Sequence, residues 1–331
     1  MLNELFYKCY FLIVGFTFLI KGADLFVGSS SNIAKKIGIP SVIVGLTIVS
    51  LGTSAPELAV SSISALQGNN GIAIGNVLGS NIFNTLVVLG GTAITMPLII
   101  NKKLIKRDFF FNLIIVCLLY VLAFGITLSG NDGILTRIEG ILLLIISIVY
   151  TIILIKSASK TNKDENTKES SKEELDEIKI WPNIFKIIIG IIGIILGGNL
   201  VVNGATEIAY SIGMSEKLVG LTIVAVGTSL PELVTSIVAA LKGETEIAIG
   251  NVLGSNIFNI LLILGLSSTI NPIVVTGNLS IDLMFLLFST VVIGFLIYLN
   301  KGNDIKKLSR SEGTILVLLY VVYLSYIIIR N

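Results

Sequence analysis

Ten apolar runs divide this sequence, and each is long enough to cross a lipid bilayer as a helix of about 20 residues. Hydrophobic residues make up 53% of the chain and charged residues only 13%. The runs lack the period-two alternation of a β-barrel. We therefore predict an all-α integral membrane protein with ten transmembrane helices, at about 5–28, 41–66, 71–97, 109–129, 136–155, 183–210, 217–241, 246–270, 279–299 and 311–329.

The chain also contains a long internal repeat. The stretch "IAIGNVLGSNIFN" occurs at 72–84 and, letter for letter, at 247–259. The same shift aligns "GLTIVSLGTSAPELAVSSISAL" (45–66) with "GLTIVAVGTSLPELVTSIVAAL" (220–241) without a gap. Each half then holds five helices, and an odd number inserts the second half upside down. Inverted repeats of this kind are typical of secondary transporters.

This repeat gives the expected domain boundaries. The first five-helix half covers 1–156, with its repeat segment at about 41–97. The second half covers 181–331, with its repeat segment at about 216–270. The linker at 157–180 is rich in Lys, Glu, Ser and Asn, and its composition predicts a solvated tether. Most of the 23 Lys and Arg residues lie on the linker side of the membrane if both termini are outside, so the positive-inside rule predicts a cytoplasmic linker.

Two carboxylates lie inside apolar runs, where a charge is costly and therefore indicates a function. They are Glu57 in "GTSAPE" and Glu232 in "GTSLPE", and the repeat relates them. Inversion predicts that the two acids face one another near the middle of the membrane. Pro56 and Pro231 lack an N–H and break the helix before each acid, which makes backbone carbonyls and hydroxyls available as ligands. The hydroxyl-bearing residues of these turns are Thr53, Ser54, Thr228 and Ser229.

The duplicated stretch adds further polar groups at helical spacing. Ser80 and Asn84 are four residues apart and share a helix face, as do Ser255 and Asn259. Together with the acids they form a set of oxygen ligands, which suits hard cations such as Ca²⁺ or Na⁺. Two ionised glutamates balance the charge of one Ca²⁺, and Na⁺ or protons that replaced it would occupy the same carboxylates. Close helix packing is the simpler interpretation of the glycines in this stretch, Gly75, Gly79, Gly250 and Gly254.

Several classes of function are excluded or disfavoured. The chain has no histidine, which excludes HExxH zinc chemistry and histidine-dependent triads. We expect no enzyme activity and no cofactor, because Ca²⁺ and Na⁺ would be transported rather than retained. Asp24, with Lys21 one turn earlier, fits a local ion pair better than a ligand.

With these motifs the sequence resembles the cation/Ca²⁺ antiporter superfamily, in particular the prokaryotic sodium/calcium exchangers. The pair "GTSAPE…GNVLGSNIFN" and "GTSLPE…GNVLGSNIFN" carries the resemblance. It implies alternating access in a ten-helix inverted-repeat fold, with cation sites between the second, third, seventh and eighth helices. It implies that Ca²⁺ is bound by Glu57 and Glu232 with the carbonyls of Thr53 and Thr228. The implied Na⁺ ligands are Ser54, Ser80 and the Ser50 carbonyl on one side and Ser229, Ser255 and the Ala225 carbonyl on the other, with Asn84 and Asn259 flanking the centre.

Two details within the resemblance favour Na⁺ coupling without K⁺. K⁺-dependent exchangers have an aspartate where this chain has Asn259. The H⁺-coupled branch usually has an acid after its "GN", where this chain has Val77-Leu78 and Val252-Leu253. An H⁺/Ca²⁺ exchanger that uses the same two glutamates remains the alternative. A cation channel is disfavoured, because opposed acids in an inverted repeat do not suggest a continuous pore.

The expected protein is therefore an antiporter that exchanges Na⁺ for Ca²⁺ and is electrogenic if three Na⁺ replace one Ca²⁺. We expect it to act as a monomer in the plasma membrane of a prokaryote, with the lipid bilayer and the two ions as its partners and no nucleic acid.

Overall fold

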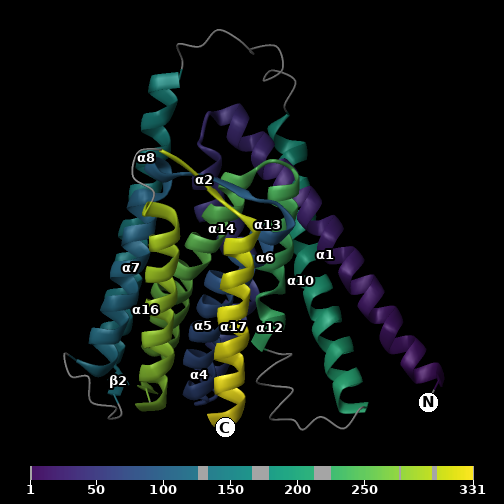
Figure 1. Cartoon of the computed structure of the whole chain (residues 1–331), viewed down its shortest axis with the longest axis vertical. Coiled ribbons are helices and arrows are strands. Elements are labelled where there is room, and N and C mark those ends of the chain that lie inside the picture. The colour runs from purple at the N-terminus through teal and green to yellow at the C-terminus, as the bar shows by residue number, and fades with distance from the viewer. Residues whose placement is uncertain are drawn as a thin grey trace.

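The computed structural model describes residues 2–125, 133–165, 179–211, 225–275, 277–299 and 304–330 of the chain. Helices dominate this part of the molecule (Figure 1). The elements in chain order are α1 (Leu2–Ile37), α2 (Ser41–Val44), the π-helical turn η1 (Gly45–Val49), α3 (Ser50–Thr53), α4 (Ala55–Leu66), α5 (Asn70–Phe83), the π-helical turn η2 (Asn84–Val88), α6 (Leu89–Thr95), β1 (Leu98–Asn101), α7 (Lys102–Phe124), β2 (Gly133–Leu135), α8 (Arg137–Glu165), α10 (Ile180–Ser211), α12 (Ala225–Thr228), α13 (Leu230–Leu241), α14 (Thr245–Phe258), the π-helical turn η4 (Asn259–Leu264), α15 (Gly265–Ile270), β3 (Ile273–Val275), α16 (Gly277–Tyr298), β4 (Ile305–Leu308) and α17 (Arg310–Arg330).

The described residues confirm a multi-pass membrane architecture. Eight helices are long and apolar enough to cross a bilayer, and the bent pair Ser41–Thr53 and Ala55–Leu66 raises the number to nine. The seventh expected helix, 217–241, is described only from Ala225, where α12 and the short apolar helix α13 follow one another. Residues 217–224 lie outside the described residues, so the ten-helix count stays a prediction.

Three expected boundaries differ most from the structure. The first helix is expected to end near 28, but α1 continues to Ile37. The fourth helix was expected at 109–129, but α7 begins at Lys102, because the Asn101 side chain accepts a hydrogen bond from the Lys103 N–H at 3.1 Å and caps the helix start. The fifth helix was expected to end near 155, but α8 continues to Glu165, inside the expected linker at 157–180. The residues that extend α8 include Lys, Ala and Glu, which favour helix. Residues 166–178 of the expected linker lie outside the described residues.

Two short antiparallel ribbons join the halves of the chain. Strand β1 pairs with β4, with Leu98 opposite Leu308, and β2 pairs with β3, with Leu135 opposite Ile273. Each ribbon therefore takes one strand from each half. These strands could not be predicted from the sequence. Segments of three or four residues beside long apolar runs are too short to show an alternation of apolar and polar residues.

The long helices α1 and α10 lie side by side (Figure 1). Glycines bring their backbones into contact: a Cβ on Gly22 would lie 2.8 Å from the Gly190 carbonyl oxygen, and a Cβ on Gly190 would lie 2.8 Å from the Gly22 carbonyl oxygen. Small residues allow this approach in a membrane, where packing rather than the hydrophobic effect holds helices together.

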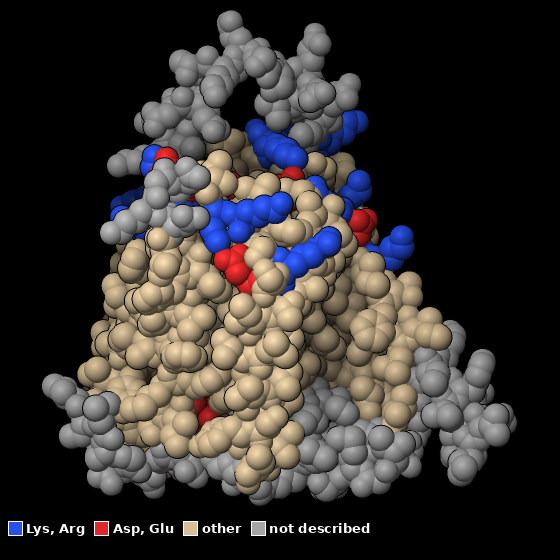
Figure 2. All heavy atoms as spheres, in the orientation of Figure 1, with Lys and Arg blue, Asp and Glu red and all other residues tan. Residues whose placement is uncertain are grey.

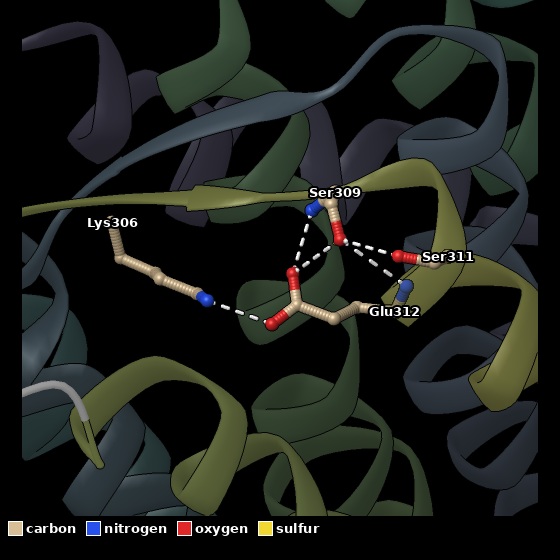
Figure 3. Close-up of polar contacts among 4 residues, drawn as sticks. All are labelled: Lys306, Ser309, Ser311 and Glu312. Carbon is tan, nitrogen blue, oxygen red and sulfur yellow. Dashed lines mark hydrogen bonds and ion pairs between the residues drawn. The ribbon is translucent and has the colours of Figure 1, made fainter.

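The last helix of each half begins with the same capping motif. At the start of α17, the Glu312 carboxylate accepts hydrogen bonds from the Ser309 N–H and hydroxyl, both at 2.7 Å, and from Lys306 at 2.7 Å (Figure 3). At the start of α8, Glu139 accepts the same pair of bonds from Thr136, at 2.6 and 2.9 Å. These reciprocal caps satisfy N–H groups that a helix start leaves without partners. The internal similarity thus extends to the helices outside the aligned repeat.

Charge gathers at one end of the molecule. Figure 2 shows Lys and Arg over the upper part of the visible face, whereas the lower part is almost free of them among the atoms that are coloured. The start of α1 and the end of α17 both lie at the lower end of the molecule, apart from one another (Figure 1). We call the end where α8 stops and α10 begins the linker side.

Near the linker side, α1 forms an ion pair with the α13–α14 turn. The Lys242 ammonium lies 2.9 Å from the Asp24 carboxylate and donates to the Asp24 carbonyl at 2.8 Å. The expected local pair of Asp24 with Lys21 is therefore wrong: the partner comes from the other half of the chain, and sequence spacing carries no information about it.

A second contact between α1 and this turn centres on Glu244. Its carboxylate accepts hydrogen bonds from Lys35, at 2.9 Å, from Ser31, and from Ser41 at 3.4 Å. Burial raises the pKa of Glu244, but the bonds from these three residues and the Lys35 charge outweigh burial and hold the pKa below its ordinary value. The ionised carboxylate therefore stabilises the folded protein. Because the folded pKa is lowered, this stabilisation is present above the ordinary carboxyl pKa and is lost as the pH falls through the folded pKa.

We expect Glu244→Gln to lower the free energy of unfolding by about 1–2 kcal/mol near neutral pH, because it removes charge-assisted hydrogen bonds. The difference from wild type should shrink as the pH falls below about 4. Thermal melting of both proteins in detergent across this pH range measures it. The control is Asp304→Asn, which removes an exposed ion pair with Lys103 and should change little. A difference between wild type and Glu244→Gln that is constant with pH would contradict the prediction.

Candidate cation-binding site

The repeat places two matching breaks in the helices on either side of the site. Ser54 separates α3 from α4 with φ −82° and ψ 10°, and Ser229 separates α12 from α13 with φ −93° and ψ 7°. Pro56 and Pro231 follow in the first turn of the next helix, where a missing N–H is tolerated. The α2–α3 and α4 segments meet at 49°. The sequence prediction of a proline-induced break is thus confirmed.

Each break presents a glutamate at a helix start. Glu57 lies in the first turn of α4 and Glu232 in the first turn of α13, and both side chains are fully buried. A helix N-terminus favours a negative charge, which offsets part of the cost of burial.

The serines of the breaks bind the glutamates crosswise. The Ser54 hydroxyl donates to Glu232 Oε1 at 2.8 Å, and the Ser229 hydroxyl donates to Glu57 Oε1 at 3.1 Å. Each half of the chain therefore holds the carboxylate of the other half. The residues expected to lie together do so.

The serines of the duplicated stretch complete this arrangement. Ser54 also lies 3.1 Å from the Ser255 hydroxyl, and Ser229 lies 3.0 Å from the Ser80 hydroxyl. Two oxygen clusters result, Ser54–Glu232–Ser255 and Ser229–Glu57–Ser80, and the sequence repeat relates them.

A second layer of amides supports the clusters. The Thr53 hydroxyl donates to Asn251 Oδ1 at 3.2 Å, and Asn251 Nδ2 donates to Ser236 at 3.0 Å and to the Glu232 carbonyl at 3.4 Å. In the repeat-related set, the Thr228 hydroxyl donates to Asn76 Oδ1 at 3.3 Å. Asn76 Nδ2 in turn donates to the Ser61 hydroxyl at 2.9 Å and to the Glu57 carbonyl at 3.4 Å. Sequence analysis missed Asn76 and Asn251, although both lie in the duplicated stretch. The shared "GNVLG" was the signal that could have found them.

Asn84 and Asn259 each begin a π-helical turn, η2 and η4. Asn259 Nδ2 donates to Asn81 Oδ1 at 3.0 Å, and Asn81 Nδ2 donates to the Asn256 carbonyl at 3.3 Å. Both Asn84 and Asn259 are fully buried. The wide turn of a π-helix often marks a functional position, and here it coincides with residues expected to flank the site.

Several buried oxygens of this region have no hydrogen-bond partner in the described part of the chain. They are Glu57 Oε2, Glu232 Oε2, Asn84 Oδ1 and Asn259 Oδ1. Buried acceptors without donors are unfavourable unless a ligand uses them. Acceptors need either donors or cations, and carboxylates with neutral oxygens are the ligands that Ca²⁺ and Na⁺ prefer. The donor set therefore fits a hard cation.

The outermost expected ligands, Ser50 and Ala225, differ from one another. The Ser54 N–H donates to the Ser50 carbonyl at 3.0 Å, four residues back, whereas the Ser229 N–H donates to the Val226 carbonyl at 3.2 Å, three residues back. The Ser50 carbonyl thus keeps a helical hydrogen bond across the first break. The two breaks are alike in sequence but not identical in hydrogen bonding.

Close packing covers the site on the linker side. A Cβ on Gly250 of α14 would lie 2.5 Å from the Val42 carbonyl oxygen and 3.0 Å from the Gly45 Cα, and a Cβ on Gly254 would lie 2.5 Å from the Ser50 hydroxyl. The helix-packing interpretation is confirmed for these glycines. Among the described residues, nothing lies within 4 Å of a Cβ added to the equivalent Gly75 and Gly79.

The chain is similar to known proteins over nearly its full length. The family model described as "Sodium/calcium exchanger protein" matches residues 8–156 and 183–329. The putative antiporter CaxA of Alkalimonas amylolytica is 38% identical over 95% of this chain and 96% of its own length. The sodium/calcium exchanger MaX1 of Methanosarcina acetivorans is 35% identical over 95% of this chain and 96% of its own length.

A solved structure has the same fold. The sodium-calcium exchanger NCX_Mj soaked with 2.5 mM Na⁺ and 0.1 mM Ca²⁺ superposes with a TM-score of 0.79 at 29% identity, covering 96% of this chain and 98% of that one. The expected resemblance to prokaryotic exchangers is thus confirmed.

Proposed function

The chain belongs to the sodium/calcium exchanger family of antiporters, which are transporters and not enzymes, and on that premise we propose that it exchanges Na⁺ for Ca²⁺ through the Glu57–Glu232 centre, electrogenically and without K⁺. The crossed serine–glutamate arrangement supports this proposal most directly. It leaves Oε2 of each carboxylate without a hydrogen-bond donor among the described residues. One Ca²⁺ balances both charges, and Na⁺ ions bind the same oxygens, so the two ions exclude each other.

The neutral residues around the acids support K⁺ independence. Asn84 and Asn259 add amide oxygens but no third charge, and no group of three or more acidic, cysteine or histidine residues clusters anywhere in the described ranges. Two negative charges suffice for one Ca²⁺, whereas a third would call for a further cation.

The location follows from the charge distribution. We place the linker side in the cytoplasm of a prokaryotic cell and both termini outside, because Lys and Arg gather at that end (Figure 2). The two halves of one chain supply both carboxylates and both crossed serines, which supports a functional monomer.

The test is ⁴⁵Ca²⁺ uptake into proteoliposomes that are loaded with Na⁺ and diluted into Na⁺-free buffer at matched pH. We expect uptake only with an outward Na⁺ gradient. Because the exchange moves net positive charge out of the vesicle, it leaves the interior negative. We therefore expect more uptake when an ionophore dissipates this membrane potential. Uptake that a pH gradient drives without Na⁺ would support the H⁺/Ca²⁺ alternative instead. That alternative draws on the same observation, since a free carboxylate oxygen also accepts a proton.

We expect Asn259→Asp to make Ca²⁺ uptake sensitive to K⁺, because a third buried charge near the two glutamates must be compensated by an added cation. Uptake by the variant should rise with K⁺ at constant Na⁺ gradient, while wild-type uptake stays unchanged. Asn69→Asp, which adds the same charge at an exposed position, serves as the control. A K⁺ response of the wild type would contradict the proposed K⁺ independence.

A further inference from the structure

An open apolar groove lies between α7 and α16, away from the cation site. Its volume is about 400 Å³. It is lined mainly by aromatic and aliphatic side chains, among them Phe109, Phe110, Leu113, Gly294, Phe295 and Tyr298. The two helices run side by side in Figure 1, and α7 begins where α16 ends, at the linker side. The Tyr298 hydroxyl donates to the Lys102 carbonyl at 3.5 Å, which links the end of α16 to the start of α7.

The groove has a built floor and exposed walls. A Cβ on Gly294 would lie 2.9 Å from Phe109 Cζ, so glycine is what lets the Phe109 ring sit against α16. The Phe109 and Tyr298 rings pack at 5.6 Å. On the walls, Phe110 is 43% exposed and Phe295 is 62% exposed. The exposed rings of Phe110 and Phe295 form the two walls of the groove.

An exposed cation of α7 lies one helical turn before Phe110, which lines the groove. Lys106 is exposed and precedes Phe110 by four residues, so both lie on one face of α7. Its neighbours are neutralised, since Lys103 pairs with Asp304 at 2.7 Å and Arg107 pairs with Asp108 at 3.0 Å. Lys106 makes no ion pair with any residue in the described part of the chain.

The opposite end of the same helix pair lacks this cation. Asp108 and Asp282 are buried near the starts of α7 and α16, and each accepts a hydrogen bond from a tyrosine of the following membrane helix, at 3.0 and 3.1 Å. With these aspartates aligned, Ser280 takes the position of Lys106. The positive charge is therefore specific to the linker-side groove, which meets the leaflet where anionic lipids concentrate.

We propose that the α7–α16 groove binds an acyl chain of an anionic phospholipid whose headgroup phosphate pairs with Lys106. Surrounding lipid tails are as apolar as the groove, so the aromatic walls select a chain by shape and not by hydrophobicity. Preference between headgroups must then come from charge. One lysine at the surface of an anionic leaflet corresponds to about a fivefold gain in affinity.

The test measures lipid binding by the purified full chain in a neutral detergent, with phosphatidylglycerol and phosphatidylcholine of identical chains, by native mass spectrometry and by thermal melting. We expect about fivefold tighter binding of phosphatidylglycerol and a larger rise in Tm with it. Lys106→Gln should abolish the preference. Lys156→Gln, which removes an exposed cation from α8 instead, should retain it.

Two further arms separate the headgroup from the chain. Leu113→Trp should weaken binding of both lipids, because the larger ring fills the groove, and the melting temperature without lipid checks that it folds. Glycerol 3-phosphate, which has no acyl chain, should neither bind nor compete. Equal binding of the two lipids by the wild type, an unchanged preference in Lys106→Gln, or full competition by glycerol 3-phosphate would each overturn the proposal.

Discussion

Glu57→Gln is expected to abolish Na⁺-driven ⁴⁵Ca²⁺ uptake and to weaken Ca²⁺ binding at least about a hundredfold. The carboxylate of Glu57 supplies half of the negative charge that balances Ca²⁺ in a fully buried site. Loss of one partner from a buried charge pair costs about 3–5 kcal/mol, which is about two to three orders of magnitude in affinity. Uptake in proteoliposomes and calorimetric titration with Ca²⁺ measure the two effects.

The same substitution should leave the fold intact or stabilise it. Glu57 is fully buried, and a neutral amide of the same shape avoids the cost of burying its charge. We therefore expect an unchanged or higher Tm for Glu57→Gln in Ca²⁺-free buffer. Asp304→Asn, a neutralisation at an exposed ion pair, is the control and should transport normally. A Glu57→Gln protein that still takes up Ca²⁺ within twofold of wild type would remove this residue from the site.

Gly250→Val is expected to reduce Ca²⁺ uptake by about tenfold to a hundredfold, because its added atoms collide with backbone on the linker side of the site. The nearest atom, the Val42 carbonyl oxygen, lies 2.5 Å from the Cβ position and cannot rotate away. Overpacking of this kind costs about 1–3 kcal/mol, which corresponds to that range. The helix that the substitution would displace, α14, contains Ser255 and is followed directly by the π-helical turn that begins at Asn259.

Gly71→Val is the matched control for this prediction. A Cβ on Gly71 meets nothing within 4 Å in the described part of the chain, and the repeat-related residue is Glu246, which already has a side chain. Its Tm and Ca²⁺ uptake should stay close to wild type. Equal losses in both valine variants would indicate a general intolerance of the broken-helix region, and the close contact at Gly250 would then not be the cause.

The positions of the acids could be predicted from sequence because their cost in a membrane is local. A Pro-Glu pair within an apolar run predicts both a helix break and a buried charge, and the duplication predicts that two such pairs meet. Ser54 and Ser229 were expected near the acids, but their crosswise bonds could not be predicted, since both serines could equally have bonded within their own half.

Contacts between segments that are distant in the chain could not be predicted from the sequence. Asp24 pairs with Lys242 and not with Lys21, because three-dimensional packing and not helical spacing brings charges together at the linker side. The ribbons were missed for a related reason, since a strand of three or four residues is stabilised by a partner elsewhere in the chain and not by its own pattern. Helix ends were predictable only to within several residues, as the extension of α8 to Glu165 illustrates.

The exchanged strands bear on the origin of the fold. Strand β1 of the first half has its partner β4 in the second, and β2 has β3, so either half on its own would present two open strand edges and a glutamate without its serine. Such a half is not a complete folding unit. An ancestor made of one such half would have needed a second copy to pair its strand edges and to complete the serine–glutamate contacts. Joining both halves in one chain makes those contacts intramolecular.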